Sequence, residues 1–143
     1  MSKMDQKLNT RKTLILEAAI TCFIEKGVHQ TGVRDIAQQA GISLGNLYNH
    51  FSGKDALIAE IATLEGKGLE TFIAKLQSDH PVKEIIKEFI DAYLDYSCEI
   101  ENTILTVEIM AEGLRNKKIA QQFDKNRTTL VQALITVMTH GIN

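Results

Sequence analysis

Residues 31–51 constrain the fold more than any other stretch, because two short helical patterns stand there with a glycine-containing turn between them. Gly41 follows the first pattern, where the left-handed conformation that ends many helices is least strained for glycine. The hydroxyls of Thr31 and Ser43 are placed to cap the first and the second helix. The apolar positions at helical spacing are Ile36, Ala37 and Ala40, followed by Leu47 and Phe51. Two helices joined by such a turn form a helix-turn-helix unit.

The second of these helices is too short to bury much, and its outer side suits a nucleic-acid surface. The residues on that side are Leu44, Gly45, Asn46, Tyr48, Asn49 and His50. Asparagine pairs with adenine edges, leucine contacts thymine methyl groups, and glycine allows close backbone approach. Ser43, Tyr48 and His50 can donate to phosphate oxygens, and Lys54 adds a further phosphate contact. The pattern favours DNA reading over a plain helical hairpin, in which Tyr48 and His50 would be ordinary half-buried residues.

The same stretch resembles a family signature. The motif Thr31-x4-Ile36-Ala37-x2-Ala40-Gly41-Ile-Ser43-x-Gly45-x2-Tyr48-x-His50-Phe51-x2-Lys54-x2-Leu57 is similar to that of TetR-family (tetracycline-repressor-like) transcriptional regulators. The resemblance implies phosphate contacts from Thr31, Ser43, Tyr48, His50 and Lys54. It implies base contacts from Leu44, Gly45, Asn46 and Asn49. It also implies an effector site between the C-terminal helices. An effector bound there would shift the long fourth helix and so change the separation of the two reading heads of a dimer.

Composition and charge fit this interpretation. The chain has 143 residues and a net charge of −2. Residues 1–56 hold seven Lys and Arg against five Asp and Glu, whereas residues 57–143 hold nine against thirteen, so the basic part coincides with the helix-turn-helix. There is no apolar run long enough for a membrane span and no signal peptide, so we expect a cytoplasmic protein. The isolated Cys22 and Cys98 are expected to be reduced core residues.

Helical periodicity continues through the whole chain, and no strand pattern, repeat or low-complexity segment interrupts it. Beyond the helix-turn-helix we expect helices over about Thr10–Lys26, Lys54–Gln77, Val82–Ser97, Thr103–Gly113 and Lys117–His140. Ser52, Asn102 and Asn116 are expected to cap the helices that begin at Lys54, Thr103 and Lys117. The helix from Val82 opens after Pro81. The prediction is an all-α fold with a DNA-binding domain at 1–53 and a helical effector-binding and dimerisation domain at 54–143.

No catalytic or metal-binding pattern is present. The four histidines are scattered without zinc-ligand spacing, and neither a nucleophile elbow nor a phosphate loop occurs. A cluster of glutamates, Glu99, Glu101, Glu108 and Glu112, is interpreted as a solvated acidic face. The residues that would line an effector pocket are Tyr93, Tyr96, Cys98, Met110, Phe123 and Met138, with simple core packing as the alternative. We expect neither an enzyme nor a protein with a metal or cofactor.

The resulting hypothesis is a repressor that binds a palindromic operator in double-stranded DNA as a homodimer and leaves it on binding a small apolar or amphipathic effector. Family members usually continue through two further helices that form the dimer interface. The chain ends before them, so either the dimer contact is built otherwise or the chain is truncated. The competing hypothesis is a helical module for small molecules or protein partners whose head does not engage DNA.

Overall fold

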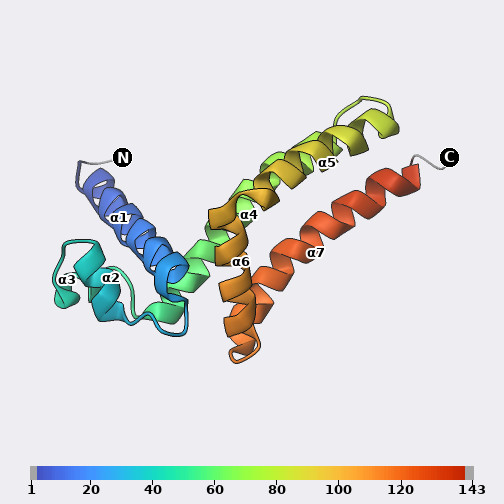
Figure 1. Cartoon of the computed structure of the whole chain (residues 1–143). Helices are drawn as coiled ribbons and strands as arrows, with labels where there is room; N and C mark the ends of the chain where they lie inside the picture. The colour runs from blue at the N-terminus through green and yellow to red at the C-terminus, as the bar shows by residue number, and fades with distance from the viewer. Residues whose placement is uncertain (1–2, 141–143) are drawn as a thin grey trace.

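The computed structural model describes residues 3–140, with side chains from residue 9 onward, and this part of the chain is entirely helical (Figure 1). Its helices are α1 (Lys3–Lys26), α2 (Val33–Gln39), α3 (Leu44–Tyr48), α4 (Lys54–Leu76), α5 (Val82–Cys98), α6 (Ile100–Gly113) and α7 (Lys117–His140). The all-α prediction is confirmed. Helix α1 begins seven residues earlier than the periodicity indicated, at Lys3.

The first three helices and the start of α4 form a head around one apolar core. The core side chains include Ile15, Ala19, Cys22 and Phe23 of α1, Val28 of the following loop, Ile36 and Ala37 of α2, Leu47 of α3, and Leu57, Ile58 and Ile61 of α4. Burial of these side chains away from water is the main force that holds three short helices together. Ile109 of α6 and Ile119 of α7 join the same cluster, so the core continues from the head into the C-terminal helices.

Helix α4 leaves the head and packs against both α5 and α7, as Figure 1 shows. A second apolar cluster lies at that end, made by Leu69, Leu76, Ile85, Phe89 and Leu130. Rings of Phe72, Phe89 and Tyr93 stack or meet edge to face beside it, with centroids 5.4–6.4 Å apart. Helix α6 crosses between the two ends and packs against α1, α5 and α7.

Helix ends agree with the sequence where glycine or Asn116 marks them. Gly27 and Gly41 have φ values of +88° and +66°, the left-handed conformation expected after α1 and α2. The side-chain oxygen of Asn116 accepts from the backbone N–H of Lys118 at 3.1 Å and caps α7 as predicted.

The predicted caps Ser52 and Asn102 are wrong. Gly53, not Ser52, stands at the N-cap of α4, without a side-chain hydrogen bond. Helix α6 begins earlier than predicted, so Glu99 occupies its N-cap and Asn102 lies inside the helix. The Asn102 amide instead donates back to the Tyr96 carbonyl at 3.0 Å, because it lies beside the end of α5.

The two cysteines differ in environment. Cys22 is buried in the head core as predicted, and burial raises the pKa of its thiol. Cys98 is exposed at the end of α5, so its prediction as a core residue is wrong. The described helices include none that combines the length and the apolar composition of a membrane span.

Candidate nucleic-acid interface

Helices α2 and α3 are joined by a four-residue turn, Ala40–Ser43, with Gly41 as its left-handed residue. The hydroxyl of Ser43 accepts a 3.1 Å hydrogen bond from the backbone N–H of Asn46, which confirms the predicted cap of α3. On the inner side of α3, Leu47 is fully buried in the head core. The cap and the anchor together fix which side of this five-residue helix faces outward.

That outer side carries the residues predicted to meet DNA. Ser43, Gly45, Tyr48 and Asn49 are exposed, and Leu44, Asn46 and His50 are partly exposed. Tyr48 has 49% of its surface exposed, and a Cβ atom placed on Gly45 would find no other heavy atom within 4 Å. The helix therefore presents polar side chains around an open glycine.

Thr31 is placed differently from the prediction. It is 1% exposed, and its hydroxyl donates to the carbonyl oxygens of Gly27 at 2.7 Å and Cys22 at 3.2 Å. The Gly27 carbonyl, directly after α1, also accepts from the Thr31 backbone N–H at 3.2 Å. Helix α2 is capped instead by Gly32, whose N–H donates to the Asp35 carboxylate at 2.8 Å. The Thr31 hydroxyl therefore neither caps α2 nor lies open to a phosphate.

Lys54 also makes contacts within the protein. Its ammonium donates to the carbonyl oxygens of Val28 at 2.8 Å, Thr31 at 3.1 Å and His29 at 3.4 Å. An ammonium has three donors, so these contacts use all of them. Lys54 thus fastens the α1–α2 loop to the start of α4, and a phosphate contact would require it to give up one of these bonds.

The glutamates of α6 hold the same loop from its other side. A Glu108 carboxylate oxygen accepts from the Val28 N–H at 3.0 Å. Glu112, with a side chain only 14% exposed, lies 3.5 Å from the His29 ring. The predicted solvated acidic face is therefore wrong for these two residues, because α6 packs beside the head. The exposed members of the cluster are Glu99 and Glu101.

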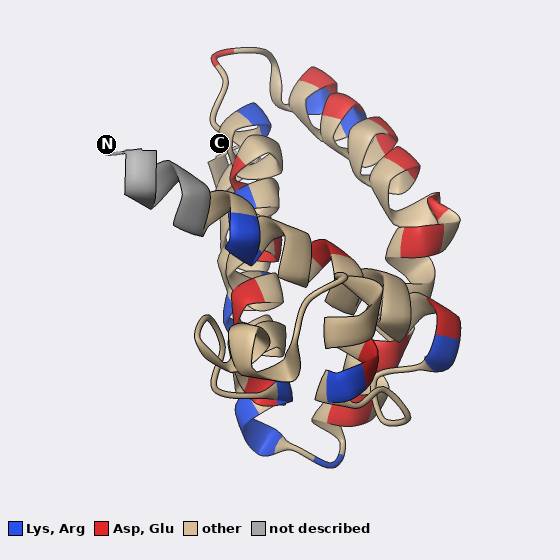
Figure 2. Cartoon of the chain, turned by 90° about the vertical axis from the view of Figure 1, so that its left-hand side faces the viewer, with Lys and Arg blue, Asp and Glu red and all other residues tan. Residues whose placement is uncertain are grey.

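Charges on the head are mixed. Lys26 and Asp35 form a 3.1 Å ion pair, which raises the pKa of the lysine. The pKa of Asp35 is lowered, first by the Gly32 N–H and then by Lys26. The ammonium of Lys12 lies 5.9 Å from the centre of the Phe51 ring. Figure 2, which faces this end of the molecule, shows Lys and Arg interspersed with Asp and Glu.

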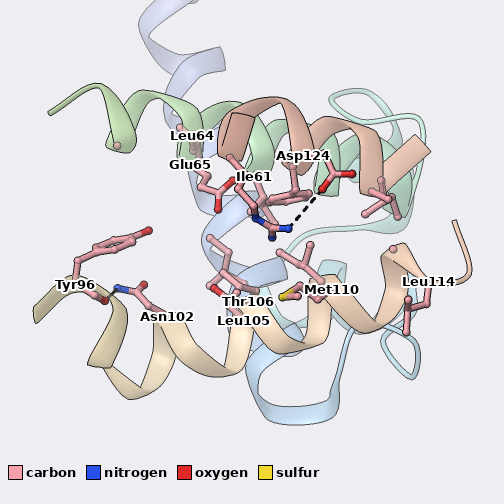
Figure 3. Close-up of a pocket in the computed structure, with 18 residues that line it drawn as sticks. Ile61, Leu64, Glu65, Tyr96, Asn102, Leu105, Thr106, Met110, Leu114 and Asp124 are labelled. Carbon is pink, nitrogen blue, oxygen red and sulfur yellow. Dashed lines mark hydrogen bonds and ion pairs between the residues drawn. The ribbon is translucent and has the colours of Figure 1, made fainter. Parts of the chain in front are cut away.

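A cavity of about 400 Å³ lies behind the head, between α4, α6 and α7. Its apolar walls include Ile20, Ile61, Leu64, Leu105, Ile109, Met110, Leu114, Ile119 and Phe123. Figure 3 shows Thr106 and Met110 of α6 facing Ile61 and Glu65 of α4 across it. Because Ile20 belongs to α1 and Ile61 to the start of α4, an occupant of this cavity would touch the helices of the head.

Three of the six residues predicted for an effector pocket line this cavity, namely Tyr96, Met110 and Phe123. Tyr93 lines an adjoining cavity of about 210 Å³ that shares Tyr96 and Phe123. Cys98 and Met138 line neither of the two and lie exposed on α5 and α7, so the structure does not bring them to the others.

Polar groups concentrate at one part of the cavity, and periodicity did not single them out. The partly buried Glu65 accepts from the Asn126 amide at 2.8 Å. Burial raises the pKa of this carboxyl, against the lowering influence of Asn126 and Arg127. The Arg127 guanidinium lies 3.6 Å from Asp124 (Figure 3). The pKa of Tyr96 is raised by burial and then by Glu65. An apolar chamber with a few polar side chains is the usual form of a small-molecule site.

Within residues 9–140, no three His, Cys, Asp or Glu side chains gather as ligands for a metal ion. The outer side of α3 and the cavity behind the head are two features of the described chain that suit binding.

The chain is similar in sequence and in structure to known bacterial regulatory proteins. Residues 15–61 match the family model of bacterial regulatory proteins of the tetR family. The HTH-type transcriptional regulator UidR of Escherichia coli K12 is 31% identical over 133 residues, which are 92% of this chain and 66% of UidR. The solved structure of Salmonella enterica GusR is 28% identical, with a TM-score of 0.79 over 92% of this chain and 67% of GusR. A structure of FadR from Bacillus subtilis in complex with stearoyl-CoA shares the fold, with a TM-score of 0.77 at 23% identity over 91% of this chain and 70% of FadR.

Proposed function

The chain belongs to the TetR family of bacterial regulatory proteins, and on this basis we propose that it is a DNA-binding transcriptional repressor released by a small-molecule effector. The chain spans 66% of the length of UidR, so the activity of the whole protein is part of the proposal. The observation that carries it is the outer side of α3: a capped helix, anchored by Leu47, that turns Asn46, Tyr48 and Asn49 outward.

We assign two kinds of DNA contact to this surface. Leu44, Gly45, Asn46 and Asn49 would meet base edges in the major groove, where a helix can enter. Ser43, Tyr48 and His50 would donate to phosphates and fix the orientation of α3. Lys54 would contribute to DNA binding chiefly by holding the α1–α2 loop in place, because its three donors are already bonded to backbone carbonyls.

Two copies of the chain would act together. Helix α3 has five residues, so one head reads only a short stretch of sequence. A two-fold symmetric pair reads a palindrome whose half-sites lie about one helical turn of DNA, or a multiple of it, apart. The proposed division of labour places DNA reading in residues 1–53 and effector binding and dimerisation in residues 54–143. The boundary at residue 53 separates the two proposed functions but not two packing units, because Leu57 and Ile58 of α4 complete the core of the head.

The cavity between α4, α6 and α7 is the proposed effector site. The structurally similar FadR is described as a complex with stearoyl-CoA, an amphipathic molecule. The apolar walls here, with Glu65, Tyr96 and Arg127 among the lining residues, suit an amphipathic molecule of smaller size. Such an effector would release DNA by binding the non-reading arrangement of the heads more tightly than the reading one.

Selection of duplexes from a random pool, followed by anisotropy titrations at several salt concentrations, tests the proposal. We expect an enriched palindrome and a logarithm of affinity that falls linearly with the logarithm of salt, by about 0.9 per phosphate contacted. Binding of apolar dyes without any enriched sequence or salt-dependent DNA binding would instead favour the helical ligand-binding module.

A further inference from the structure

The α1–α2 loop is held by a side chain from the start of α4 and by a side chain of α6, which lies outside the head. At Val28, the N–H donates to Glu108 of α6 at 3.0 Å and the carbonyl accepts from Lys54 of α4 at 2.8 Å. Both backbone groups of this loop residue are thus bonded to side chains of other helices, and the bond to Glu108 links the loop to the C-terminal part. The loop leads directly into α2, whose position sets that of α3.

The contact between α6 and the loop is closely fitted. Gly27 adopts φ +88°, and a Cβ atom there would lie 2.8 Å from the Glu108 carboxylate. The neighbouring Glu112 side chain lies against His29 at 3.5 Å. A hydrogen bond from a backbone N–H to a charged acceptor is stronger than one between neutral groups. The carboxylate of Glu108 therefore ties the loop to α6 rather than merely lying near it.

Other side chains of the same helix line the cavity. Thr106 and Met110 line it, and Figure 3 shows both directed into the chamber. Ile109, next to Glu108 in sequence, lines the cavity and also belongs to the head core. Because a helix of this length moves as a unit, a displacement of α6 at the cavity also displaces Glu108.

From these contacts we propose that Glu108 is a positioning residue that couples α6 to the α1–α2 loop. A shift of α6, such as one caused by an occupant of the cavity, would then move the loop and with it α2 and α3. This route runs directly from α6 to the loop and does not require a movement of α4. Its biological meaning rests on the proposed function, whereas the mechanical coupling is a property of the protein alone.

The chain offers a way to displace α6 without a ligand. Gly113 lies at the end of α6, where a Cβ atom would be 3.4 Å from the Cβ of Ala120 on α7, an ordinary contact. G113A therefore fits. G113V adds two γ-methyl groups with restricted freedom to turn away, so it wedges α6 off α7. The two variants form a matched pair at one position.

Amide hydrogen exchange measured by NMR on the full chain, without DNA or effector, tests the coupling. E108A should speed exchange at the Val28 amide about tenfold or more, because the bond to a charged acceptor is lost. E108Q keeps an acceptor oxygen and should stay within about threefold of the parent protein. G113V should speed exchange at Val28 and in residues 33–48, whereas G113A should not.

The decisive comparison is G113V in the E108A background. If Glu108 transmits the displacement of α6, G113V causes no further change in the amide exchange rates of residues 33–48 in the E108A background. In the E108Q background, G113V again speeds exchange in these residues. If G113V changes exchange in α2 and α3 equally with and without Glu108, or leaves them unchanged in the parent protein, the proposal is overturned. Neither result depends on DNA binding, so a failed DNA titration would contradict the proposed function and leave this measurement intact.

Discussion

Asn126 of α7 lies directly against Gly66 of α4: a Cβ atom on Gly66 would come within 2.8 Å of the Asn126 side-chain oxygen. The Asn126 amide donates to the Ala62 carbonyl at 2.7 Å and to the Glu65 carboxylate at 2.8 Å, so the side chain has little freedom to move aside. A glycine inside α4 therefore serves the close approach of α7, and α4 continues through it without interruption.

G66A should lower the melting temperature, although alanine is the better helix former by about 1 kcal/mol, because the new methyl group displaces Asn126 from both of its bonds. G68A is the matched control, since a Cβ there meets no atom within 4 Å, and it should raise the melting temperature by about 3 °C. Thermal unfolding followed by circular dichroism compares the two. Equal stabilisation by both substitutions would show that Asn126 yields easily.

T31V should destabilise the head by about 1–2 kcal/mol, because it removes a buried hydroxyl and leaves the Gly27 carbonyl without that donor. Urea unfolding measures the loss. The T13V variant removes an exposed hydroxyl bonded to the Asn9 carbonyl within α1, and it should cost far less. Since the Thr31 hydroxyl does not face DNA, we expect an unchanged salt slope of DNA binding for T31V. A reduced slope would mean that Thr31 does contact a phosphate.

E65Q should be more stable than the parent protein at neutral pH and lose that advantage in acid. Burial raises the pKa of Glu65 in the folded protein. The stability associated with its protonated form is then fully present below the unfolded pKa, and it disappears as the pH rises through the folded pKa. Glutamine resembles the protonated carboxyl, so melting temperatures of the two proteins should converge at about pH 4. E70Q, at an exposed glutamate of the same helix, controls for the loss of one negative charge. An advantage that persists unchanged in acid would contradict the assignment.

Features set by neighbouring residues were predictable from the sequence. Gly41 and Ser43 end one helix and begin the next through contacts within a few residues, and the structure has both as expected. The cap of α7 by Asn116 is equally local. Thr31 shows where such local reasoning fails. Its hydroxyl could have capped α2, but in the fold it donates to two buried carbonyls at the end of α1.

Contacts between distant segments left no signal in the sequence. Glu108 and Val28 are eighty residues apart, and a glutamate in an acidic stretch looks like surface until α6 is placed beside the head. Glu65 likewise stands among apolar residues of α4 without a partner in sequence, because Asn126 comes from α7. Aromatic and methionine residues predicted the pocket only in part: Tyr96 and Met110 line it, whereas Cys98 and Met138 face outward.

Y48F should weaken binding to every duplex by a similar factor, about tenfold, because a hydroxyl that donates to a phosphate carries no sequence information. The substitution keeps the ring and removes one oxygen from an exposed side chain, so the fold should be unaffected. Y96F, in the cavity, is the control and should leave DNA affinity unchanged. Anisotropy titrations on the selected operator and on single-base variants of it make the comparison. A loss confined to particular base pairs would assign Tyr48 to base reading.

N46A should act differently from Y48F. Asn46 is partly exposed on the outer side of α3, and its backbone N–H is already bonded to the Ser43 hydroxyl, so only the side-chain amide is free to read a base. Loss of a bidentate contact should reduce affinity for the operator by about 1–3 kcal/mol and relax preference at one base pair in each half-site. Affinity for unrelated duplexes should remain the same, because no phosphate contact is removed. The measurement is the full set of single-base operator variants titrated with both proteins. If N46A weakens all of them equally, as expected for Y48F, then Asn46 contacts the backbone and the assignment of base contacts to the outer side of α3 is wrong at this residue.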